Sequence, residues 1–527
     1  MAMLSILAVD IPLTLLAASL AVAYLWLKRR NYGLPLPPGP KGWPLIGNVF
    51  DMPMSRGWEV YHKWCKELGT GLLYLNATGT KIIVLDTYED CVALLEKRSA
   101  IYSGRMQMPM YQDLMGWDFS FVGADYGNVW RRSRRLAHNS FNSNAVKSFQ
   151  PLQLKTARKI LPQLGENTDI MPLLRHNAGG TILSVTYGLD VQPKNDPFIE
   201  SAEKAIESLQ NIPYPGAYLV DHFHFLKYIP AWLPGAKFKR DANEWRKLTL
   251  DMINKPFDAL KAEMARGTAT PSFAYNLLQK AGYKETKDLY TDTNMRNVSA
   301  SLYQAGVETV RIFVDIFYGE SALTGATRNQ TQILLGLCVL TLLSHPDMME
   351  KIQDEIDLVT NGSRLPEFSD EENVPYLKAF IKEALRFWSF VPLSVPHYLS
   401  VDDEYKGYFL PADSMIIPNT WAIMHNEKVF VEPYTFNPDR FLTGDNLKEI
   451  NAHYAASWGF GRRVCPGRFF AAGTMWITLA HILAVYDVKK AKDADGNVIE
   501  PNTNLATSVH QRLTLAHLYR VPKRPRH

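Results

Sequence analysis

Cys465 lies in a loop rich in glycine and arginine, residues 458–467, just before an apolar stretch, residues 469–485, that predicts a helix. A thiol just before the start of a helix meets the positive end of the helix dipole and several unpaired backbone N–H groups. Together with the charges of Arg462 and Arg463, these donors favour the thiolate, which is the form of cysteine that binds metal ions. A fold built on this chain must therefore place a reactive sulfur at a helix start.

The glycines of this loop point the same way. Gly461 and Gly467 allow the backbone to turn tightly and to approach a flat ligand closely. A cysteine before a helix is more often an ordinary buried thiol, but glycine and arginine at these offsets favour a metal ligand. The run resembles the haem-thiolate loop of the cytochrome P450 family, with Trp458 where that family usually has phenylalanine. The resemblance implies haem (iron protoporphyrin IX) as the cofactor and Cys465 as the proximal ligand of its iron.

The composition excludes several classes of protein. The chain has 527 residues, enough for two or three ordinary domains or for one large enzyme with a single core. A net charge of +4 and dispersed basic residues argue against a nucleic-acid partner. Four cysteines in so long a chain do not make a disulfide scaffold, and they fit a domain that faces the reducing cytosol.

The N-terminus predicts a membrane anchor. Residues 11–27 are almost entirely apolar, and as a helix they span about 25 Å, marginally enough for a bilayer core of about 30 Å. Basic residues 28–30 follow, so the positive-inside rule places the rest of the chain in the cytoplasm. A cleaved secretory signal is the alternative, but its basic residues would precede the apolar run. We predict an anchor over residues 1–30, a stiff proline-rich hinge over residues 31–40 and one haem-thiolate monooxygenase domain over residues 41–527.

Periodicity predicts a mainly α fold with small β-sheets. Residues 71–85 and 391–417 carry strand and turn signals. Helical periodicity covers residues 130–139, 145–164, 170–187, 197–211, 237–266, 295–309, 331–360 and 374–388. The resemblance implies the cytochrome P450 fold, preceded by one N-terminal transmembrane helix. A similar hinge occurs in microsomal P450s, which implies a single-pass protein of the endoplasmic reticulum membrane with a cytosolic catalytic domain.

Glu383 and Arg386 stand three residues apart, on one face of a predicted helix. Such a pair is ordinarily a solvated surface pair that contributes little to stability. Here the neighbouring residues are apolar, which predicts a buried pair whose hydrogen bonds must all be satisfied. Arg440 resembles the third partner of this pair in the P450 family, and the resemblance implies a charge network that holds the cysteine loop in place.

Trp130 and Arg134 lie four residues apart and can present an indole N–H and a guanidinium to an anionic group. A solvated run of charges would explain this segment equally well. The segment resembles the first haem-binding helix of the P450 family, and the resemblance implies that His397 and Arg463 complete a clamp on the haem propionates. Tyr398 departs from the family pattern, since many members have arginine there, and this predicts a weaker clamp from that strand.

Residues 305–309 (Ala-Gly-Val-Glu-Thr) resemble the oxygen-activating segment of the family, although such a string is common in ordinary helices. The resemblance implies that Gly306 makes room against the haem face. It also implies that Glu308 and Thr309 form the catalytic acid–alcohol pair that delivers protons during oxygen activation.

Residues 310–330 have no counterpart in the family pattern. Removing them joins Thr309 to Thr331 and restores the family spacing to His345. The ends of the segment can be encoded by splice-donor and splice-acceptor sequences, and its 21 codons correspond to 63 nucleotides, a short intron of the kind common in fungi. We interpret the segment as a retained intron; the alternative is a genuine loop or a bend in the helix.

The motifs follow one another in the order that the P450 family shows. The resemblance implies a monooxygenase of fungal secondary metabolism or xenobiotic oxidation that uses O2 and inserts one oxygen atom into a small apolar organic substrate. Electrons would come from an NADPH-dependent cytochrome P450 reductase, because the chain has no nucleotide-binding glycine loop. The predicted docking surface is the basic face that includes Arg462 and Arg468.

Alternatives remain open at this stage. One is an inactive haem-binding pseudoenzyme, if residues 310–330 disorder the oxygen site. Another is an isomerase or dehydratase of the same fold, against which Glu308 and Thr309 argue.

The methionine-rich residues 103–122 suit a flexible substrate lining, although such stripes are more often core. The apolar loop 229–235 could contact membrane lipid and admit substrate from it.

Overall fold

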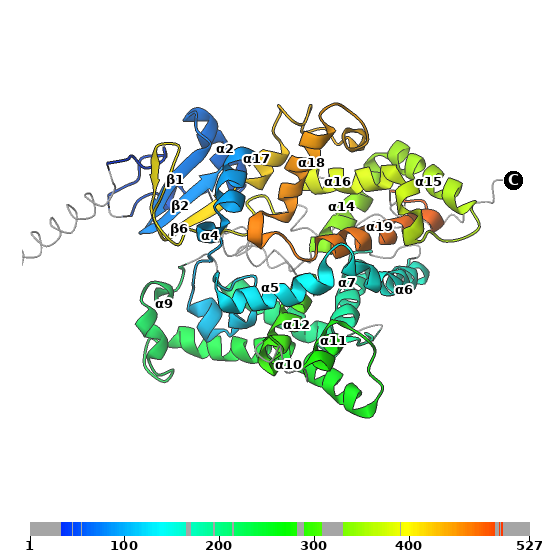
Figure 1. Cartoon of the computed structure of the whole chain (residues 1–527), viewed down its shortest axis with the longest axis horizontal. Coiled ribbons are helices and arrows are strands. Elements are labelled where there is room, and N and C mark those ends of the chain that lie inside the picture. The colour runs from blue at the N-terminus through cyan, green and yellow to red at the C-terminus, as the bar shows by residue number, and fades with distance from the viewer. Residues whose placement is uncertain are drawn as a thin grey trace, which may run out of the picture.

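The structure is a computed structural model of the chain. It describes residues 33–490 except 45, 54, 165–169, 193–194, 213–215, 282–288, 308–329 and 390, and in addition residues 495, 497 and 498. The predicted anchor, Glu308, Thr309 and nearly all of the predicted insert lie outside these described residues. The strands gather at one end of the molecule and helices make up the rest (Figure 1). The predicted fold class, mainly α with small β-sheets, is confirmed for the described chain.

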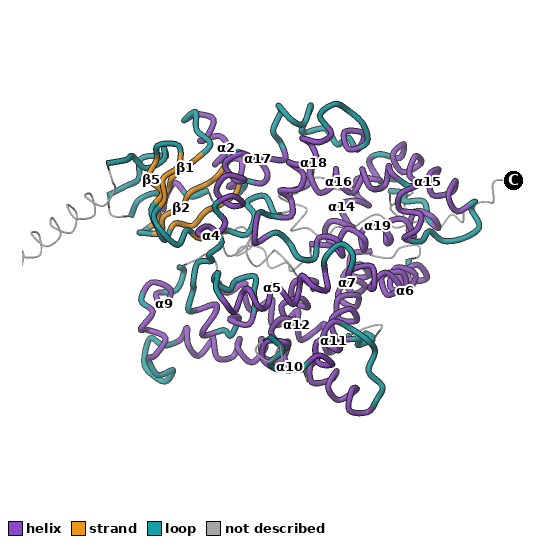
Figure 2. Tube along the Cα trace, in the orientation of Figure 1, coloured by secondary structure: helices purple, strands orange, loops and turns teal. Residues whose placement is uncertain are grey.

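The main sheet joins two segments that lie far apart in the sequence. Its strands follow the order β1 (Leu72–Ala77), β2 (Thr80–Leu85), β6 (Ser414–Pro418) and β3 (His397–Tyr398). β1 and β2 form an antiparallel hairpin, whereas β2 and β6 run parallel with Ile83 opposite Ile416. A second hairpin pairs β4 (Asp403–Tyr405) with β5 (Tyr408–Leu410). Figure 2 shows these strands as one group beside α2, and both predicted strand regions are confirmed.

Each predicted helical stretch is helical in its described part, but those over 145–164, 197–211 and 331–360 are divided, and the helices over 57–67, 273–280 and 447–455 were not predicted. The longer helices are α2 (Gly57–Glu67), α5 (Asn128–Phe141), α6 (Gln150–Ile160), α7 (Ile170–Tyr187), α8 (Pro197–Glu207), α10 (Lys237–Arg266), α11 (Phe273–Lys280), α12 (Asp292–Val307), α14 (Gln330–Ser344), α15 (Pro346–Thr360), α16 (Pro375–Trp388), α18 (Leu447–Ala455) and α19 (Arg468–Val485). Short helices are α3 (Tyr88–Cys91), α4 (Ser99–Tyr102), α9 (Leu219–His222) and α17 (Thr420–Met424). The stretch predicted as one helix over 331–360 is two helices, because Pro346 lacks the N–H that would continue α14 and instead starts α15.

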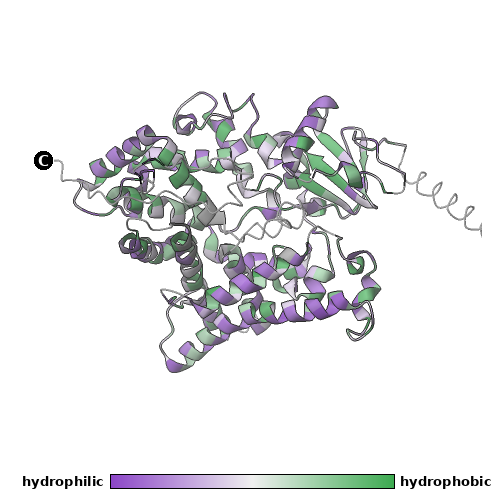
Figure 3. Ribbon diagram, turned by 180° about the vertical axis from the view of Figure 1, so that it is seen from behind, coloured by the Kyte–Doolittle hydropathy of each residue, from purple (hydrophilic) through white to green (hydrophobic). Residues whose placement is uncertain are grey.

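α7 joins the two helices that flank residues 308–329. Both α12 and α14 pack against it. At Gly306, near the end of α12, an added Cβ would lie 2.2 Å from Cγ1 of Ile182 in α7, so only glycine permits this approach. The predicted reason for this glycine was room for haem; in the structure it is also required for helix packing. Hydrophilic residues run along the outer helix α10, while the sheet is strongly hydrophobic (Figure 3).

α19 is the central helix of the core. It is long and apolar enough to span a membrane by composition, and it is the one helix of this kind in the part of the chain that the structure describes. Residues 474–483 are all buried, and α6, α15 and α16 pack around it. An apolar surface on every side is what a fully buried helix requires. The start of α19, where Cys465 lies, is therefore held in place by the core.

The proline-rich segment is not a free spacer in its described part. The carbonyl oxygen of Pro35 accepts a hydrogen bond from the backbone N–H of Phe409 at 2.8 Å, and that of Pro38 accepts one from Tyr74 at 2.9 Å. A Cβ on Gly39 would lie 2.0 Å from the carbonyl oxygen of Tyr74, so the close approach depends on glycine. The segment predicted as a mechanically independent hinge is therefore fastened to both sheets.

Candidate active site

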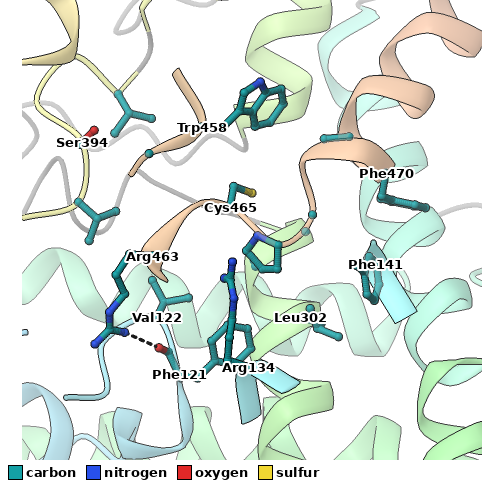
Figure 4. A pocket seen from close by; sticks show the side chains of 18 of the residues that line it. Phe121, Val122, Arg134, Phe141, Leu302, Ser394, Trp458, Arg463, Cys465 and Phe470 are labelled. Atoms are coloured by element: carbon teal, nitrogen blue, oxygen red, sulfur yellow. Dashed lines mark hydrogen bonds between the residues drawn. The ribbon is translucent and has the colours of Figure 1, made fainter. Parts of the chain in front are cut away.

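The cysteine loop closes on itself just before α19. The backbone N–H of Cys465 donates to the carbonyl oxygen of Trp458 at 2.7 Å. The cysteine side chain projects into a cavity of about 270 Å³ that Trp458 and Gly467 also line (Figure 4). A Cβ on Gly467 would meet no atom within 4 Å, so the space beside this residue is open.

Gly461 provides the tight turn that the sequence predicts. Its φ of +53° lies in the left-handed region, and an added Cβ would lie 2.2 Å from the carbonyl oxygen of Leu95. The glycine therefore lets the loop pack against the segment η2 (Val92–Lys97), and it does not face the cavity as the sequence suggested.

The electrostatics of Cys465 also differ from expectation. Burial raises the pKa of its thiol, and this effect outweighs hydrogen bonds from the backbone of Gly467 and Arg468 and the charge of Arg134. The backbone donors and nearby arginines therefore act in the predicted direction, toward the thiolate, but burial outweighs them in the protein without a metal ion. A metal cation bound directly to the sulfur would stabilise the thiolate and so overcome the effect of burial.

A cluster of cationic side chains surrounds one edge of the cavity. Arg463 donates to the carbonyl oxygens of Ser103 at 2.7 Å, Ala124 at 2.8 Å and Phe121 at 3.3 Å (Figure 4). Burial and the nearby charge of Arg105 lower the pKa of Arg463 to about 8. A buried cation whose guanidinium meets mainly carbonyl oxygens favours an anionic ligand.

Arg105 is the member of this cluster that the sequence did not reveal. It donates to the carbonyl oxygens of Pro396 at 2.6 Å and Val122 at 3.2 Å, and burial lowers its pKa to about 9. It lies beside His397, the residue whose strand lacks the arginine of the family pattern at Tyr398. One signal was available: Arg105 is the only charged residue between Arg98 and Asp113, inside an apolar, methionine-rich run.

Trp130 and Arg134 come from α5, as predicted, and both line the cavity. Arg134 donates to the carbonyl oxygen of Val464, next to the cysteine. The guanidinium of Arg463 lies over the indole ring of Trp130, with 4.6 Å between Cζ and the ring centroid. The structure thus brings these residues of the predicted propionate clamp to one edge of the cavity.

His397 also lines the cavity and is buried. Its Nδ1–H donates to the carbonyl oxygen of Tyr102 at 2.8 Å. Burial, together with the charges of Arg105 and Arg463, holds the pKa of His397 well below its usual range. The ring is therefore neutral at pH 7 in the protein without a ligand.

The rest of the cavity wall is mainly apolar. It includes Phe121, Leu302, Ala305, Gly306 and Leu385. The methionines Met108, Met110 and Met115, which the sequence offered as a substrate lining, are buried in the core around α5 and α12 instead. The alternative that this stripe is core is therefore the correct one for these three residues.

The predicted charge network lies behind this wall and is buried. Arg386 Nε donates to Glu383 Oε2 at 2.7 Å, and both side chains are fully buried. Arg440 Nε lies 3.2 Å from the same carboxylate oxygen, and the backbone N–H of Asn437 donates to the other at 2.9 Å. The predicted burial of Glu383 and Arg386 is confirmed, and Arg440 joins the pair as expected. It ties α16, which contributes Leu385 to the cavity, to the segment around residue 437.

This fold and this cavity define a class of mainly helical enzymes in which a cysteine at the start of a buried helix faces a pocket edged by arginines. The chain belongs to the cytochrome P450 family, which matches it over residues 37–314 and 322–514. The interval between the two matched stretches falls inside residues 310–330.

Relatives of known name support this placement. The chain is 38% identical over 483 residues to cytochrome P450 monooxygenase 98 of Postia placenta, covering 91% of this chain and 88% of the relative. It is 37% identical over 506 residues to a cytochrome P450 monooxygenase of Armillaria gallica, covering 93% and 94%. It is 34% identical over 472 residues to tryptamine 4-monooxygenase of Psilocybe cyanescens, covering 88% of each. The chain is a cytochrome P450 monooxygenase, and its family implies a haem-thiolate cofactor.

The residues present fit such a cofactor. Haem is flat, apolar in its ring and carries two carboxylates at one edge. The cavity offers apolar walls, a sulfur that can bind iron, an open space at Gly467 and three arginines at one edge, of which Arg105 is buried and Arg134 and Arg463 are partly buried. Burial lowers the pKa of Arg105 and of Arg463 because it destabilises their charged forms. Carboxylates bound beside them would offset this effect.

Proposed function

We propose that this monooxygenase binds haem through Cys465 and uses O2 to oxidise an apolar organic molecule in fungal secondary metabolism or xenobiotic oxidation. The observation that carries the proposal is that Cys465 and the three arginines Arg105, Arg134 and Arg463 line one cavity. When bound, haem supplies the chemistry that inserts one oxygen atom of O2 into a C–H or C=C bond. The chain's own residues bind the cofactor, orient it and exclude water.

The proposed roles at the cavity edge follow from charge. Arg105, Arg134 and Arg463 bind the two carboxylates of the cofactor, because carboxylate contacts offset the desolvation of buried guanidinium groups. Trp130 orients Arg463 by lying against its guanidinium. The Nδ1–H of His397 donates to the carbonyl oxygen of Tyr102, so Nε2 of the neutral ring carries no proton and cannot donate to a carboxylate. His397 therefore contacts the cofactor only as part of the cavity wall.

Proton delivery is assigned to Glu308 and Thr309, which directly follow α12. Support comes from Ala305 and Gly306, one turn earlier, which line the cavity. The Thr309→Ala enzyme should consume NADPH and release peroxide with little product. Normal coupling between NADPH consumption and product in this variant would reject the assignment.

The mainly apolar wall of the cavity supports an apolar substrate. The polar side chains that line it are already bonded within the protein: Thr181 Oγ1 donates to Asn177 at 2.6 Å, and Ser394 Oγ pairs with Thr420 Oγ1 at 2.7 Å. Substrate-binding difference spectra with a panel of terpenes, steroids and aromatic compounds would test this. Preference for charged molecules over all of these would contradict it.

The redox partner proposed is an NADPH-dependent cytochrome P450 reductase that docks on the basic face beside Cys465. Arg462 is exposed there, and Arg468 is partly exposed. Electrostatic docking predicts that the rate of haem reduction by the reductase falls with added salt and in an Arg462→Glu variant. A rate that depends on neither would place the partner elsewhere.

Membrane attachment is proposed through the anchor at residues 1–30 and a second, apolar contact, with the protein in the endoplasmic reticulum membrane. The second contact is supported by exposed aromatic side chains around α9 and the loop that follows it: Phe223, Phe225, Tyr228 and Trp232. Removing residues 1–30 should weaken membrane association without abolishing haem binding, and a further Trp232→Ser change should release the protein from vesicles. Loss of haem from the truncated protein would contradict the proposed domain boundary.

Residues 310–330 are proposed to be a retained intron. The interval in the family match at residues 315–321 supports this, as does the packing of both α12 and α14 against α7. A second candidate follows from the same interval: if the segment is present in the mature protein and disorders the oxygen site, the chain is an inactive haem-binding pseudoenzyme. A ferrous carbon monoxide complex of the thiolate type without any NADPH-dependent product would favour this candidate.

The central test is Cys465→Ser in the full-length protein. It should abolish the thiolate-type band of the ferrous carbon monoxide complex and leave helical circular dichroism unchanged. Cys338→Ala is the matched control, since Cys338 is also a free cysteine but is buried in α14 and lines no part of this cavity. A band that survives in Cys465→Ser would reject Cys465 as the iron ligand.

A further inference from the structure

The arginine cluster carries more positive charge than two carboxylates can neutralise. Arg105, Arg134 and Arg463 contribute three positive charges, and His397 is neutral. Two carboxylates would leave one positive charge in a partly buried edge, where a net charge is unfavourable. A further anion near the cluster is therefore expected.

Asp125 is placed to supply it. It lies in the turn before α5, and its Oδ1 accepts a hydrogen bond from the backbone N–H of Arg105 at 3.1 Å. The carbonyl oxygen of the preceding residue, Ala124, accepts a hydrogen bond from the guanidinium of Arg463 at 2.8 Å. The negative charge of Asp125 also raises the pKa of Arg105, against the effect of burial. The carboxylate thus lies beside the backbone contacts of two arginines from distant parts of the chain.

We propose that Asp125 is the resident counter-ion of the arginine cluster, so that the cavity edge is electrically neutral when it holds a ligand with two carboxylates. The proposal rests on the haem site described above. A negative charge at this edge stabilises ferric over ferrous iron and so lowers the reduction potential of the bound haem. Because the side chain of Asp125 is exposed, salt screens its influence.

The test uses the full-length protein with its haem. Asp125→Asn keeps an oxygen acceptor for the N–H of Arg105 and removes only the charge. We expect a more positive reduction potential, with a larger shift at low salt than at high salt. Transfer of haem to apomyoglobin should slow roughly two- to fivefold, because the carboxylates of haem no longer face a like charge. Asp125→Glu should behave like the wild type in both measurements.

The control is Asp118→Asn, which removes an exposed carboxylate from the nearby segment η4 (Trp117–Phe119). If Asp125 acts only as a hydrogen-bond acceptor, Asp125→Asn will change neither measurement and Asp125→Ala will speed haem loss; that result overturns the proposal. Equal shifts in Asp118→Asn and Asp125→Asn also overturn it. The ferrous carbon monoxide spectrum distinguishes failure of the haem site from failure of the counter-ion. A wild type without thiolate-bound haem rejects the site itself. A normal spectrum together with an unshifted reduction potential in Asp125→Asn rejects only the counter-ion.

Discussion

The carbonyl oxygen of Trp458 accepts the backbone N–H of Cys465 at 2.7 Å. This bond closes the loop across seven residues and leaves the next backbone donors, at Gly467 and Arg468, directed at the sulfur. The loop is therefore shaped by its own backbone and by the buried helix behind it. A pocket prepared in this way gives a ligand a defined position for the sulfur before it binds.

Replacing Arg105 should weaken haem retention. Arg105→Gln removes a buried charge-assisted contact of about 1.5–3 kcal/mol, which corresponds to roughly 10- to 100-fold faster haem loss. The measurement is haem transfer to apomyoglobin, with circular dichroism to verify folding. Arg135→Gln on the exposed face of α5 is the control and should retain haem normally. Equal rates in the two variants would exclude Arg105 from the site.

Breaking the buried ion pair should destabilise the fold. Glu383→Gln leaves the fully buried guanidinium of Arg386 without its charge partner, which costs about 3–5 kcal/mol. Urea unfolding measures the loss of free energy. Glu200→Gln removes the acid from an exposed pair with Lys204 and should change stability by less than about 1 kcal/mol. Similar losses in both variants would mean that the triad is not the structural element proposed.

Stability should fall as the pH is lowered, in part through His425. Burial lowers its pKa to about 4, from a usual value near 6.5. Between these values the unfolded chain binds a proton that the folded protein excludes, so this contribution is complete above pH 6.5 and is lost toward pH 4. From pH 7 to pH 5 the free energy of unfolding should fall by about 2 kcal/mol through this residue.

The comparison that isolates this term is the difference in pH dependence between the wild type and His425→Gln. His397, whose pKa is also lowered by burial, adds to the slope of both proteins and cancels in the difference. Parallel stability curves from pH 7 to pH 5 would show that His425 is not the residue responsible.

Deleting residues 310–330 should raise haem occupancy, stability and activity together. The deletion joins Thr309 to Thr331, so that α12 and α14 can continue as one helix along α7, against which both already pack. Each helical turn out of register moves its neighbours by about 5.4 Å, far more than proton delivery can absorb. Thermal unfolding and the carbon monoxide difference spectrum give the comparison. A mature transcript that keeps the 63 nucleotides, together with normal turnover by the full-length protein, would end the intron interpretation.

Local patterns in the sequence predicted most of the secondary structure, and the resemblance of its motifs to the P450 family predicted the class of reaction. The cysteine loop, the pair Glu383 and Arg386, and the strands over 71–85 each depend on residues within a few positions of one another. Such signals act through helix dipoles, side-chain spacing and β-propensity, which need no knowledge of the rest of the chain.

Other features came only from the tertiary structure, because they depend on burial and on contacts between distant segments. Arg105 joins the site by donating to Pro396, almost three hundred residues away. Gly461 is needed because Leu95 lies against it. The thiol of Cys465 has a raised pKa because the core excludes water from it, and this desolvation outweighs the helix-start donors that the sequence displays. The amino-acid sequence by itself determined which groups the chain possesses and which elements carry them; packing decided which of those groups share a cavity and how much their charges cost there.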